Sequence, residues 1–258
     1  MEKKSAFITG GTKGLGKRTA EAMAAMGYDL YLNYRTEYPE TRAWVLRLQH
    51  TYRIHVELVK GNMSILDDCK SVSRHIRDHV PNLAAVILNA GPYIADRKLL
   101  ADYTENEWNE LVNGNLSSAF YILKELIPVL RQNKGRIITF GFDKVESAPG
   151  WMFRSAFAAA KSGLASLTKS IAMEEAANGI TANMICPGDI TGEWKEKMIE
   201  EAIHFHDPKK PVGRPGTGED IARMVTFLCD EKSDFITGSI FQINGGQDVL
   251  SKSSREGK

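Results

Sequence analysis

Short apolar runs alternate with longer segments of helical periodicity along almost the whole of this 258-residue chain. The clearest run, AAVILNA at residues 84–90, is apolar at nearly every position. A strand of this kind is covered on both faces, as in a parallel sheet flanked by helices. The alternation therefore predicts an α/β fold, a single-domain doubly wound parallel sheet of about seven strands flanked by helices. The predicted strands are residues 5–9, 30–34, 55–59, 84–90, 136–140, 180–186 and 239–243.

The segments between the predicted strands keep their apolar residues at helical spacing. In the segment 65–79, for example, Ile65, Cys69 and Ile76 fall on one helix face. The sequence holds no Pro/Ser-rich linker and no internal repeat, so we expect one domain over residues 1–248 and a polar tail over 249–258. The predicted helices cover residues 37–52, 65–79, 104–131, 155–177 and 218–229, and another begins at Gly14 and ends at Gly27.

One stretch of the chain, roughly residues 187–216, shows neither the periodicity of a strand nor that of a helix. It contains four prolines and a short helical piece. A loop of this length inside a compact domain is usually a binding loop or a lid. We therefore expect this segment to form the substrate-binding lid. Its acidic and basic residues are mixed, so its charge does not indicate which substrate it binds.

Charge and cysteine content exclude several classes of protein. The formal net charge is +1, and no basic stripe is present, so we expect no nucleic-acid partner. The cysteines are only three, at 69, 186 and 229, without CxxC spacing, so we expect neither disulfides nor a metal site. The sequence has no long apolar run and no signal-like N-terminus, so we expect a cytoplasmic protein with no membrane partner.

A glycine-rich turn, TGGTKGLG at residues 9–16, joins the first predicted strand to the first predicted helix. Gly10, Gly14 and Gly16 are spaced so that the backbone can turn tightly and approach a diphosphate at the helix N-terminus. Alone, this could be an ordinary glycine-rich turn. Its place between a strand and a helix at the start of the chain favours a dinucleotide-binding site.

The end of the second predicted strand bears on the choice of cofactor. An acidic residue there would bind the adenosine ribose and favour NAD, but the sequence reads Asn33, Tyr34, Arg35. Arg35 and Lys13 offer two cations for a 2′-phosphate. Both could instead be solvated surface charges. Their coincidence at the two relevant turns predicts NADP(H) in preference to NAD(H).

Several motifs together resemble the short-chain dehydrogenase/reductase family, in particular its classical branch and members like 3-oxoacyl-(acyl carrier protein) reductase. The resemblance covers nearly the whole chain, from Ser5 to about Gly246. The motifs, in family order and spacing, are TGGTKGLG, LNAG (88–91), Asn115 in NGNL, Lys161 in AFAAAK, CPGDI (186–190) and ITGSIFQINGG (236–246).

The resemblance implies a set of cofactor-binding residues. Asn62 stands where an aspartate usually meets the adenine, and its amide can both donate and accept hydrogen bonds. Gly192 replaces a usual threonine near the nicotinamide, and Thr191 stands one place early. The residues expected to contact the cofactor are Gly10, Thr12, Lys13, Gly14, Leu15, Gly16, Arg35, Asn62, Met63, Asn89, Ala90, Gly91, Lys161, Pro187, Gly188, Ile190 and Thr191.

The resemblance also implies a catalytic set of Asn, Ser, Tyr and Lys, which this chain matches only in part. Asn115 and Lys161 match the asparagine and the lysine. Phe157 stands at the tyrosine position, and Phe142 aligns best with the serine position. In the family the lysine binds the nicotinamide ribose, which would explain why Lys161 shares an apolar helix face with no acid. The alternative is a lysine whose stem covers apolar surface.

A phenylalanine at position 157 cannot donate a proton, and loss of a general acid typically costs about 10²–10⁴ in rate. Substitutes would be Tyr93, Ser147, Ser155 or a water held by Lys161 and Asn115, although each of these side chains could be an ordinary loop residue.

Two functions therefore stay open. One is an NADP(H)-dependent oxidoreductase acting on a carbonyl or alcohol without the family tyrosine. The other is a non-catalytic NADP(H)-binding relative that acts as a sensor or assembly partner. The resemblance further implies a homodimer or homotetramer, paired through the helices at 104–131 and 155–177.

Overall fold

The computed structural model describes residues 3–248 of the chain. Within them, seven strands form one sheet in the order β3-β2-β1-β4-β5-β6-β7, and every neighbouring pair is parallel. The predicted fold class is confirmed, while the predicted tail at 249–258 lies outside the described residues. The strands are β1 Ser5–Ile8, β2 Asp29–Tyr34, β3 Val56–Lys60, β4 Leu83–Leu88, β5 Arg136–Phe140, β6 Thr181–Pro187 and β7 Ile240–Ile243.

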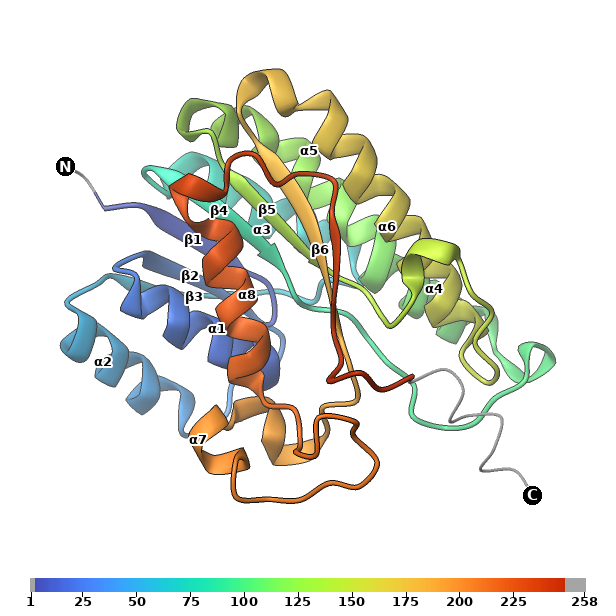
Figure 1. Ribbon diagram of the computed structural model, residues 1–258. Coiled ribbons are helices and arrows are strands. Elements are labelled where there is room, and N and C mark those ends of the chain that lie inside the picture. The colour runs from blue at the N-terminus through green and yellow to red at the C-terminus, as the bar shows by residue number, and fades with distance from the viewer. Residues whose placement is uncertain (1–2, 249–258) are drawn as a thin grey trace.

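Helices cover both faces of this sheet, as Figure 1 shows. Helices α1, α2 and α8 lie on one face, and α3, α5 and α6 lie on the other. The longer helices are α1 Gly14–Ala25, α2 Thr41–Tyr52, α3 Leu66–His79, α4 Glu105–Val112, α5 Ser118–Leu130, α6 Ser155–Glu174 and α8 Gly218–Cys229.

Strand β4 shows why a wholly apolar run is needed at the centre of the sheet. All six of its residues are buried. Val86 and Leu88 belong to the core formed with α3, α5 and α6, whereas Ala85 and Ile87 belong to the core formed with α1, α2 and α8. Since side chains alternate between the two faces of a strand, both sets must be apolar.

Two predicted helices differ from the observed ones. Helix α2 begins at Thr41 and not at residue 37, because Pro39 disfavours the helical conformation of the residue before it. The predicted helix 104–131 is broken into α4 and α5 by a π-helical turn at Asn113–Ser117. Such turns add one residue to the helical repeat and occur often at functional sites.

The strand order places a switch point between β1 and β4. The chain leaves β1 towards β2 and β3 on one side, and leaves β4 towards β5, β6 and β7 on the other. In doubly wound sheets, ligands bind in the crevice outside the carboxyl ends of the strands at this point. The turns that follow Ile8 and Leu88 are therefore where a ligand site is expected.

The predicted lid at 187–216 contains two short helical pieces, a 3₁₀ turn at Gly192–Glu196 and α7 at Ile199–Ala202. The 3₁₀ turn packs against α1 and α8, so closely that a Cβ on Gly218 would lie 2.0 Å from the Lys195 carbonyl oxygen. Over residues 3–248, no helix is both long and apolar enough to cross a membrane.

Candidate active site

The glycine-rich turn between β1 and α1 depends on glycine at several positions. Gly10 and Gly14 have φ values of +60° and +56°, in the left-handed region that favours glycine. A Cβ on Gly16 would lie 2.2 Å from the Gly10 carbonyl oxygen, so no larger residue fits there. The turn thus brings backbone N–H groups to the N-terminus of α1, where an anion can bind.

Residues after β4 hold this turn in place. The Asn89 Nδ2 atom donates to the carbonyl oxygens of Thr9 at 3.1 Å and Gly10 at 3.2 Å. The Ala90 N–H donates to the Thr9 Oγ1 atom at 2.9 Å. The LNAG and TGGTKGLG motifs, which lie far apart in the sequence, therefore form one structural unit at the switch point.

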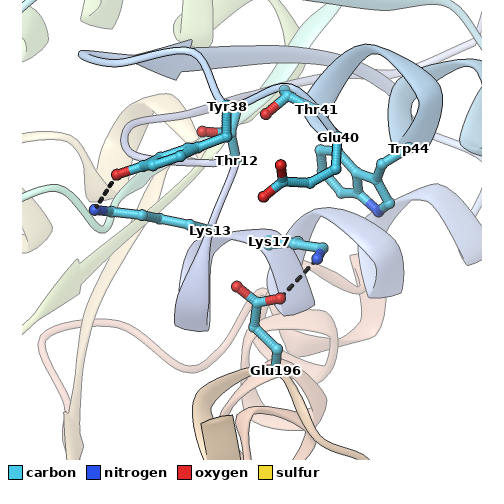
Figure 2. Close-up of a pocket in the computed structure, with 8 residues that line it drawn as sticks. All are labelled: Thr12, Lys13, Lys17, Tyr38, Glu40, Thr41, Trp44 and Glu196. Carbon is cyan, nitrogen blue, oxygen red and sulfur yellow. Dashed lines mark hydrogen bonds and ion pairs between the residues drawn. The ribbon is translucent and has the colours of Figure 1, made fainter. Parts of the chain in front are cut away.

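A pocket of about 220 Å³ opens beside this turn, at the start of α1 and α2. Figure 2 shows Lys13 directed at Tyr38, and their Nζ and hydroxyl atoms are 3.2 Å apart. Arg35 is not among the lining residues, and its Nη1 atom lies 3.9 Å from Glu110 Oε1. The lining residues are Thr12, Lys13, Lys17, Tyr38, Glu40, Thr41, Trp44 and Glu196.

Several of these lining residues were missed by the sequence reasoning. Lys17 lies one helical turn after Lys13, so helical spacing could have identified it. Tyr38 and Trp44 could be identified only with the observed start of α2 at Thr41, because the predicted helix began at residue 37. Glu196 comes from the lid, 182 residues after Gly14, and no local signal could have found it.

Asn62 and Met63, which the resemblance implies would contact the adenine, follow β3. The Asn62 N–H donates to the Asp68 carboxylate at 2.7 Å, and its carboxamide oxygen accepts from the Ser64 N–H at 3.0 Å. Met63 is buried under α3. The half-buried Asn62 side chain is therefore held in a local turn at the carboxyl edge of the sheet.

Lys161, Asn115 and Gly91 converge beside the switch point. An ideal Cβ on Gly91 would lie 2.2 Å from Asn115 Oδ1 and 3.4 Å from Lys161 Nζ. The π-helical turn carries Asn115, whose Nδ2 atom donates to the carbonyl oxygens of Pro92 and Leu111. Its Oδ1 atom is buried and accepts no hydrogen bond from the described residues. That orphaned acceptor, near a buried ammonium, is typical of a site that binds a polar ligand.

Lys161 is only 4% exposed, yet it forms no hydrogen bond or ion pair within residues 3–248. Burial lowers the pKa of its ammonium group to about 8. Buried charges are normally paired, so a lysine of this kind needs a ligand to satisfy it. A buried lysine without a hydrogen bond or ion pair among the described residues is consistent with the ribose-binding role that the resemblance implies.

Four aromatic side chains gather next to Lys161. Phe142, two residues after β5, stacks on Trp151 with ring centres 5.2 Å apart, and its ring centre lies 6.2 Å from that of Phe157. The edge of Tyr93 meets Phe157 at 5.2 Å. The structure thus brings together Phe142 and Phe157, the two residues that the resemblance aligns with the family serine and tyrosine. Between them they make an apolar surface in this part of the site.

Tyr93 brings a hydroxyl to this apolar surface. It is half exposed, and its oxygen accepts a hydrogen bond from Arg154 Nε at 2.7 Å. The remaining nitrogens of Arg154 donate to the backbone carbonyls of Ala95, Asp96 and Phe153. Arg154, which the sequence reasoning missed, therefore fixes the loop that carries Tyr93.

The other two candidate hydroxyls differ from Tyr93. Ser147 donates to the Lys144 carbonyl oxygen at 2.9 Å and is bound within its own turn. Ser155 lies in the first turn of α6, and its Oγ atom is buried without a partner among the described residues. Neither contacts the Phe157 ring in the way that Tyr93 does.

The CPGDI segment continues β6 towards the lid. The Gly188 N–H donates to the Ile243 carbonyl oxygen at 2.9 Å, and a Cβ on Gly188 would lie 2.6 Å from the Asn244 Cα. Ile190 is buried, while Thr191 is exposed immediately before the 3₁₀ turn. Pro187 to Thr191 thus form the border between the sheet and the lid.

Comparison with known proteins identifies relatives over the full domain. Residues 10–248 match the family model described as enoyl-(acyl carrier protein) reductase. YtkK of Bacillus subtilis (strain 168), provisionally named an oxidoreductase, is 47% identical over 96% of this chain and 97% of its own. The 3-oxoacyl-[acyl-carrier-protein] reductase FabG of Staphylococcus aureus (strain Mu50 / ATCC 700699) is 31% identical over 94% and 97%.

A solved structure agrees with these matches. A Bacillus thuringiensis protein, provisionally named a 3-oxoacyl-reductase, shares 46% identity with this chain and superposes with a TM-score of 0.86. The match covers 96% of this chain and all of the other.

Proposed function

Because this chain belongs to the short-chain dehydrogenase/reductase family, we propose that it is an NADP(H)-dependent oxidoreductase acting on a small carbonyl, alcohol or related compound. The family model and the relatives support an oxidoreductase of the short-chain dehydrogenase/reductase type. The observation that carries the rest is Lys161, a buried lysine beside Gly91 and the orphaned Oδ1 atom of Asn115, whose ammonium group faces the Phe157 ring and no acidic side chain of the described residues.

The residues present fit a dinucleotide. The absence of a Cβ at Gly16 lets the start of α1 pack directly on Gly10 and Asn89, so that the N–H groups at this helix end lie where a diphosphate could bind. Asn62, Met63 and the segment 89–91 would bind the adenosine half, and Lys161 would bind the nicotinamide ribose. Pro187, Gly188, Ile190 and Thr191 would border the nicotinamide ring. When bound, the cofactor would exchange hydride with the substrate.

Preference for the phosphorylated nucleotide rests on charge. The second strand itself ends without the acidic residue that would bind the ribose of NAD, although Glu37 and Glu40 follow it and Glu40 lines the adjacent pocket. Lys13 lines the adjacent pocket, and Arg35 is 64% exposed in its side chain with only a long ion pair to Glu110. Both cations can therefore turn to the phosphate at little cost.

Phe157 and Phe142 have no proton to give, so the chain must supply it from elsewhere. We assign this role to the Tyr93 hydroxyl, which lies on the ring that contacts Phe157. In reduction, the Tyr93 proton passes to the substrate oxygen as that oxygen gains the carbonyl electron pair. The Arg154 guanidinium would stabilise the negative charge left on the phenol oxygen, and water would return the proton.

The aromatic surface also limits the substrate. Trp151 and Phe157 offer partly exposed rings, backed by the buried Phe142, instead of the hydroxyl groups that hold a polarised carbonyl. Such a surface suits a flat, apolar body, because aromatic rings bind by stacking and area burial. We therefore propose a flat carbonyl compound, such as a diketone, quinone or pterin, as the preferred substrate.

A second candidate function is a non-catalytic NADP(H)-binding protein that acts as a sensor or assembly partner. The absence of a hydroxyl at both Phe142 and Phe157 favours it. The two functions are separated by following NADPH absorbance with a panel of ketones, diketones, quinones and pterins. Turnover of any member excludes the non-catalytic function, whereas tight NADPH binding with no turnover across the panel contradicts the oxidoreductase.

We further propose a cytoplasmic homodimer or homotetramer. Phe120 on α5 is 51% exposed and Met173 on α6 is 75% exposed, and both lie on the helices expected to pair. Large exposed apolar groups of this kind are typical of subunit interfaces. Light scattering tests the assembly, and a purely monomeric species would contradict it. The three cysteines are free and buried, as suits a reducing compartment.

A further inference from the structure

The lid places a carboxylate at the N-terminus of α1. The Glu196 Oε1 atom accepts a hydrogen bond from the Gly14 N–H at 2.7 Å, and its Oε2 atom lies 2.6 Å from Lys17 Nζ. Figure 2 shows the Glu196–Lys17 ion pair across the mouth of the pocket. One carboxylate thus binds a backbone N–H of the glycine-rich turn and a lysine of the first helix at once.

This contact uses the groups that a diphosphate would use. Helix N-termini bind phosphate through free N–H groups, and lysine binds it as a point charge. Gly14 N–H belongs to the turn assigned above to the diphosphate, so a carboxylate and a phosphate oxygen cannot both occupy it. Glu196 therefore stands where an anionic oxygen of the cofactor is expected.

The Glu196 side chain is ionised at neutral pH. Burial raises the pKa of its carboxyl group, but the hydrogen bonds from Lys17 and the Gly14 N–H outweigh burial and hold it below its usual value. Within α1 no side chain caps the N-terminus, and its first turn contains no acidic residue. Glu196 consequently supplies the negative charge that this helix end otherwise lacks.

The backbone of the lid does not need to move for this side chain to leave. The 3₁₀ turn at Gly192–Glu196 packs against Gly218 of α8, and the Ile199 N–H donates to Glu219 at 2.7 Å. The lid is therefore anchored to α8, independently of the Glu196 contact. Since the Glu196 side chain is 38% exposed, rotation about its own bonds can release Gly14 and Lys17.

We infer that Glu196 is an internal competitor of the cofactor phosphates, and that Lys17 is a phosphate-binding residue which Glu196 masks until it is displaced. This inference rests on the proposed function, because it requires a dinucleotide at the glycine-rich turn. Binding then exchanges one anion for another at Gly14 and Lys17. In the protein without cofactor, Glu196 accepts the hydrogen bond of the Gly14 N–H at the start of α1. Cofactor binding must break the contacts of Glu196 with Gly14 and Lys17, which lowers the affinity for the cofactor.

The competing explanation is that Glu196 only stabilises the fold as a tertiary cap of α1. Both explanations expect Glu196→Gln to lower the melting temperature of the protein without cofactor. They differ in what happens to affinity. A competitor, once removed, raises affinity for NADPH, whereas loss of a structural cap leaves that affinity unchanged or lowers it.

The experiment measures the NADPH dissociation constant by calorimetry for the wild type, Glu196→Gln and Glu40→Gln. Glu40 is the matched control, because it lines the same pocket and the substitution removes the same charge, without a bond to Gly14 or Lys17. Glu196→Gln should bind NADPH about twofold to fivefold more tightly, as expected for loss of one partly exposed ion pair. The gain in NADPH affinity in Glu40→Gln should be less than half of the gain in Glu196→Gln.

A second arm tests Lys17. Lys17→Met should weaken NADPH binding more in the Glu196→Gln background than in the wild type, because only there is the ammonium unmasked. Hydrogen exchange without cofactor should be faster at the start of α1 in Glu196→Gln. These measurements need no turnover and no identified substrate.

The outcomes separate the inference from the proposed function. If the wild type binds NADPH and Glu196→Gln binds it equally or less tightly, the inference is wrong and the proposed function stands. An equal gain in Glu40→Gln would also overturn it, since general charge removal would then explain the effect. If neither the wild type nor Glu196→Gln binds NADPH, the proposed function fails and the inference fails with it.

Discussion

The Nζ atom of Lys161 lies 5.8 Å from the centre of the Phe157 ring, one helical turn away on α6. The two residues have the spacing of the family's tyrosine and lysine, but the ammonium group faces a ring without a hydroxyl. If position 157 is the acid position that the resemblance implies, its supporting cation is present and its hydroxyl is absent.

Phe157→Tyr should raise carbonyl reduction by about tenfold or more, because a phenol beside Lys161 restores a general acid. The gain should stay below the full effect of such an acid, since Phe142 offers no hydroxyl to position the substrate. The rate of NADPH oxidation in the presence of a bound diketone measures this gain in carbonyl reduction. Phe235→Tyr, at a 98% exposed ring, is the matched control and should change nothing. No gain in Phe157→Tyr would contradict the assignment of position 157.

Tyr93→Phe should lower turnover by about 10² or more, as expected for loss of the proton donor. Affinity for NADPH should stay the same, because Tyr93 is assigned to the substrate and not to the cofactor. Arg154→Met should also slow turnover, since it releases the loop that holds Tyr93. Tyr52→Phe on α2 serves as control. Unchanged kinetics in Tyr93→Phe would leave a water held by Lys161 and Asn115 as the proton source.

Lys161 should give the stability of the protein a characteristic pH dependence. The folded protein loses this proton near pH 8, whereas the unfolded chain keeps it to about pH 10.5. Between these values the unfolded state binds more protons, so the free energy of unfolding rises with pH. Below pH 8 the cost of the buried charge is fully present. As pH rises towards 10.5, this cost should disappear, and the free energy of unfolding should increase by at most about 3 kcal/mol.

Urea unfolding of the wild type and Lys161→Met at neutral and alkaline pH isolates this contribution, because other titrating groups cancel in the difference. The stability advantage of Lys161→Met over the wild type should shrink as pH rises. A difference between the two that is independent of pH would show that Lys161 is solvated in the folded protein.

Gly16→Ala should weaken NADPH binding by at least about tenfold and destabilise the fold by about 1–3 kcal/mol, the usual cost of overpacking. The added methyl group would meet Gly10 and Asn89, and the glycine-rich turn would have to move away from β4. Gly150→Ala is the control, because nothing lies within 4 Å of a Cβ there. Calorimetry and thermal unfolding measure both effects. Full affinity in Gly16→Ala would mean that the turn does not hold the diphosphate.

Lys13→Ala and Arg35→Ala should each lower affinity for NADPH by about tenfold, the scale of one charged hydrogen bond. Affinity for NADH should barely change, because NADH lacks the 2′-phosphate. The ratio of the two dissociation constants is therefore the informative quantity. Equal losses for both nucleotides would instead indicate that these residues support the turn itself.

Most of the fold could be predicted from the sequence, because central parallel strands such as β4 must be apolar on both faces. The errors lay at boundaries. Pro39 shortened α2, and the π-helical turn at Asn113–Ser117 interrupted a segment whose apolar periodicity reads as one helix. The π-helical turn adds only one residue to the helical repeat, so the spacing of the apolar residues in the sequence does not reveal it.

The predictions about the candidate site concern residues that are neighbours in the sequence. The spacing of Gly10, Gly14 and Gly16, and that of Phe157 and Lys161, reports local geometry directly. The Tyr93–Arg154 and Gly14–Glu196 contacts join residues 61 and 182 positions apart. Such contacts depend on how loops pack over the finished sheet, and local patterns carry no information about that.

Titration of the wild-type protein with NADPH and, separately, with NADH by calorimetry tests the central claim most directly. We expect saturable binding of one NADPH per chain, with NADH binding more weakly. Binding of neither nucleotide would contradict the account, because the glycine-rich turn, Asn89 and the buried Lys161 would then have no ligand in common.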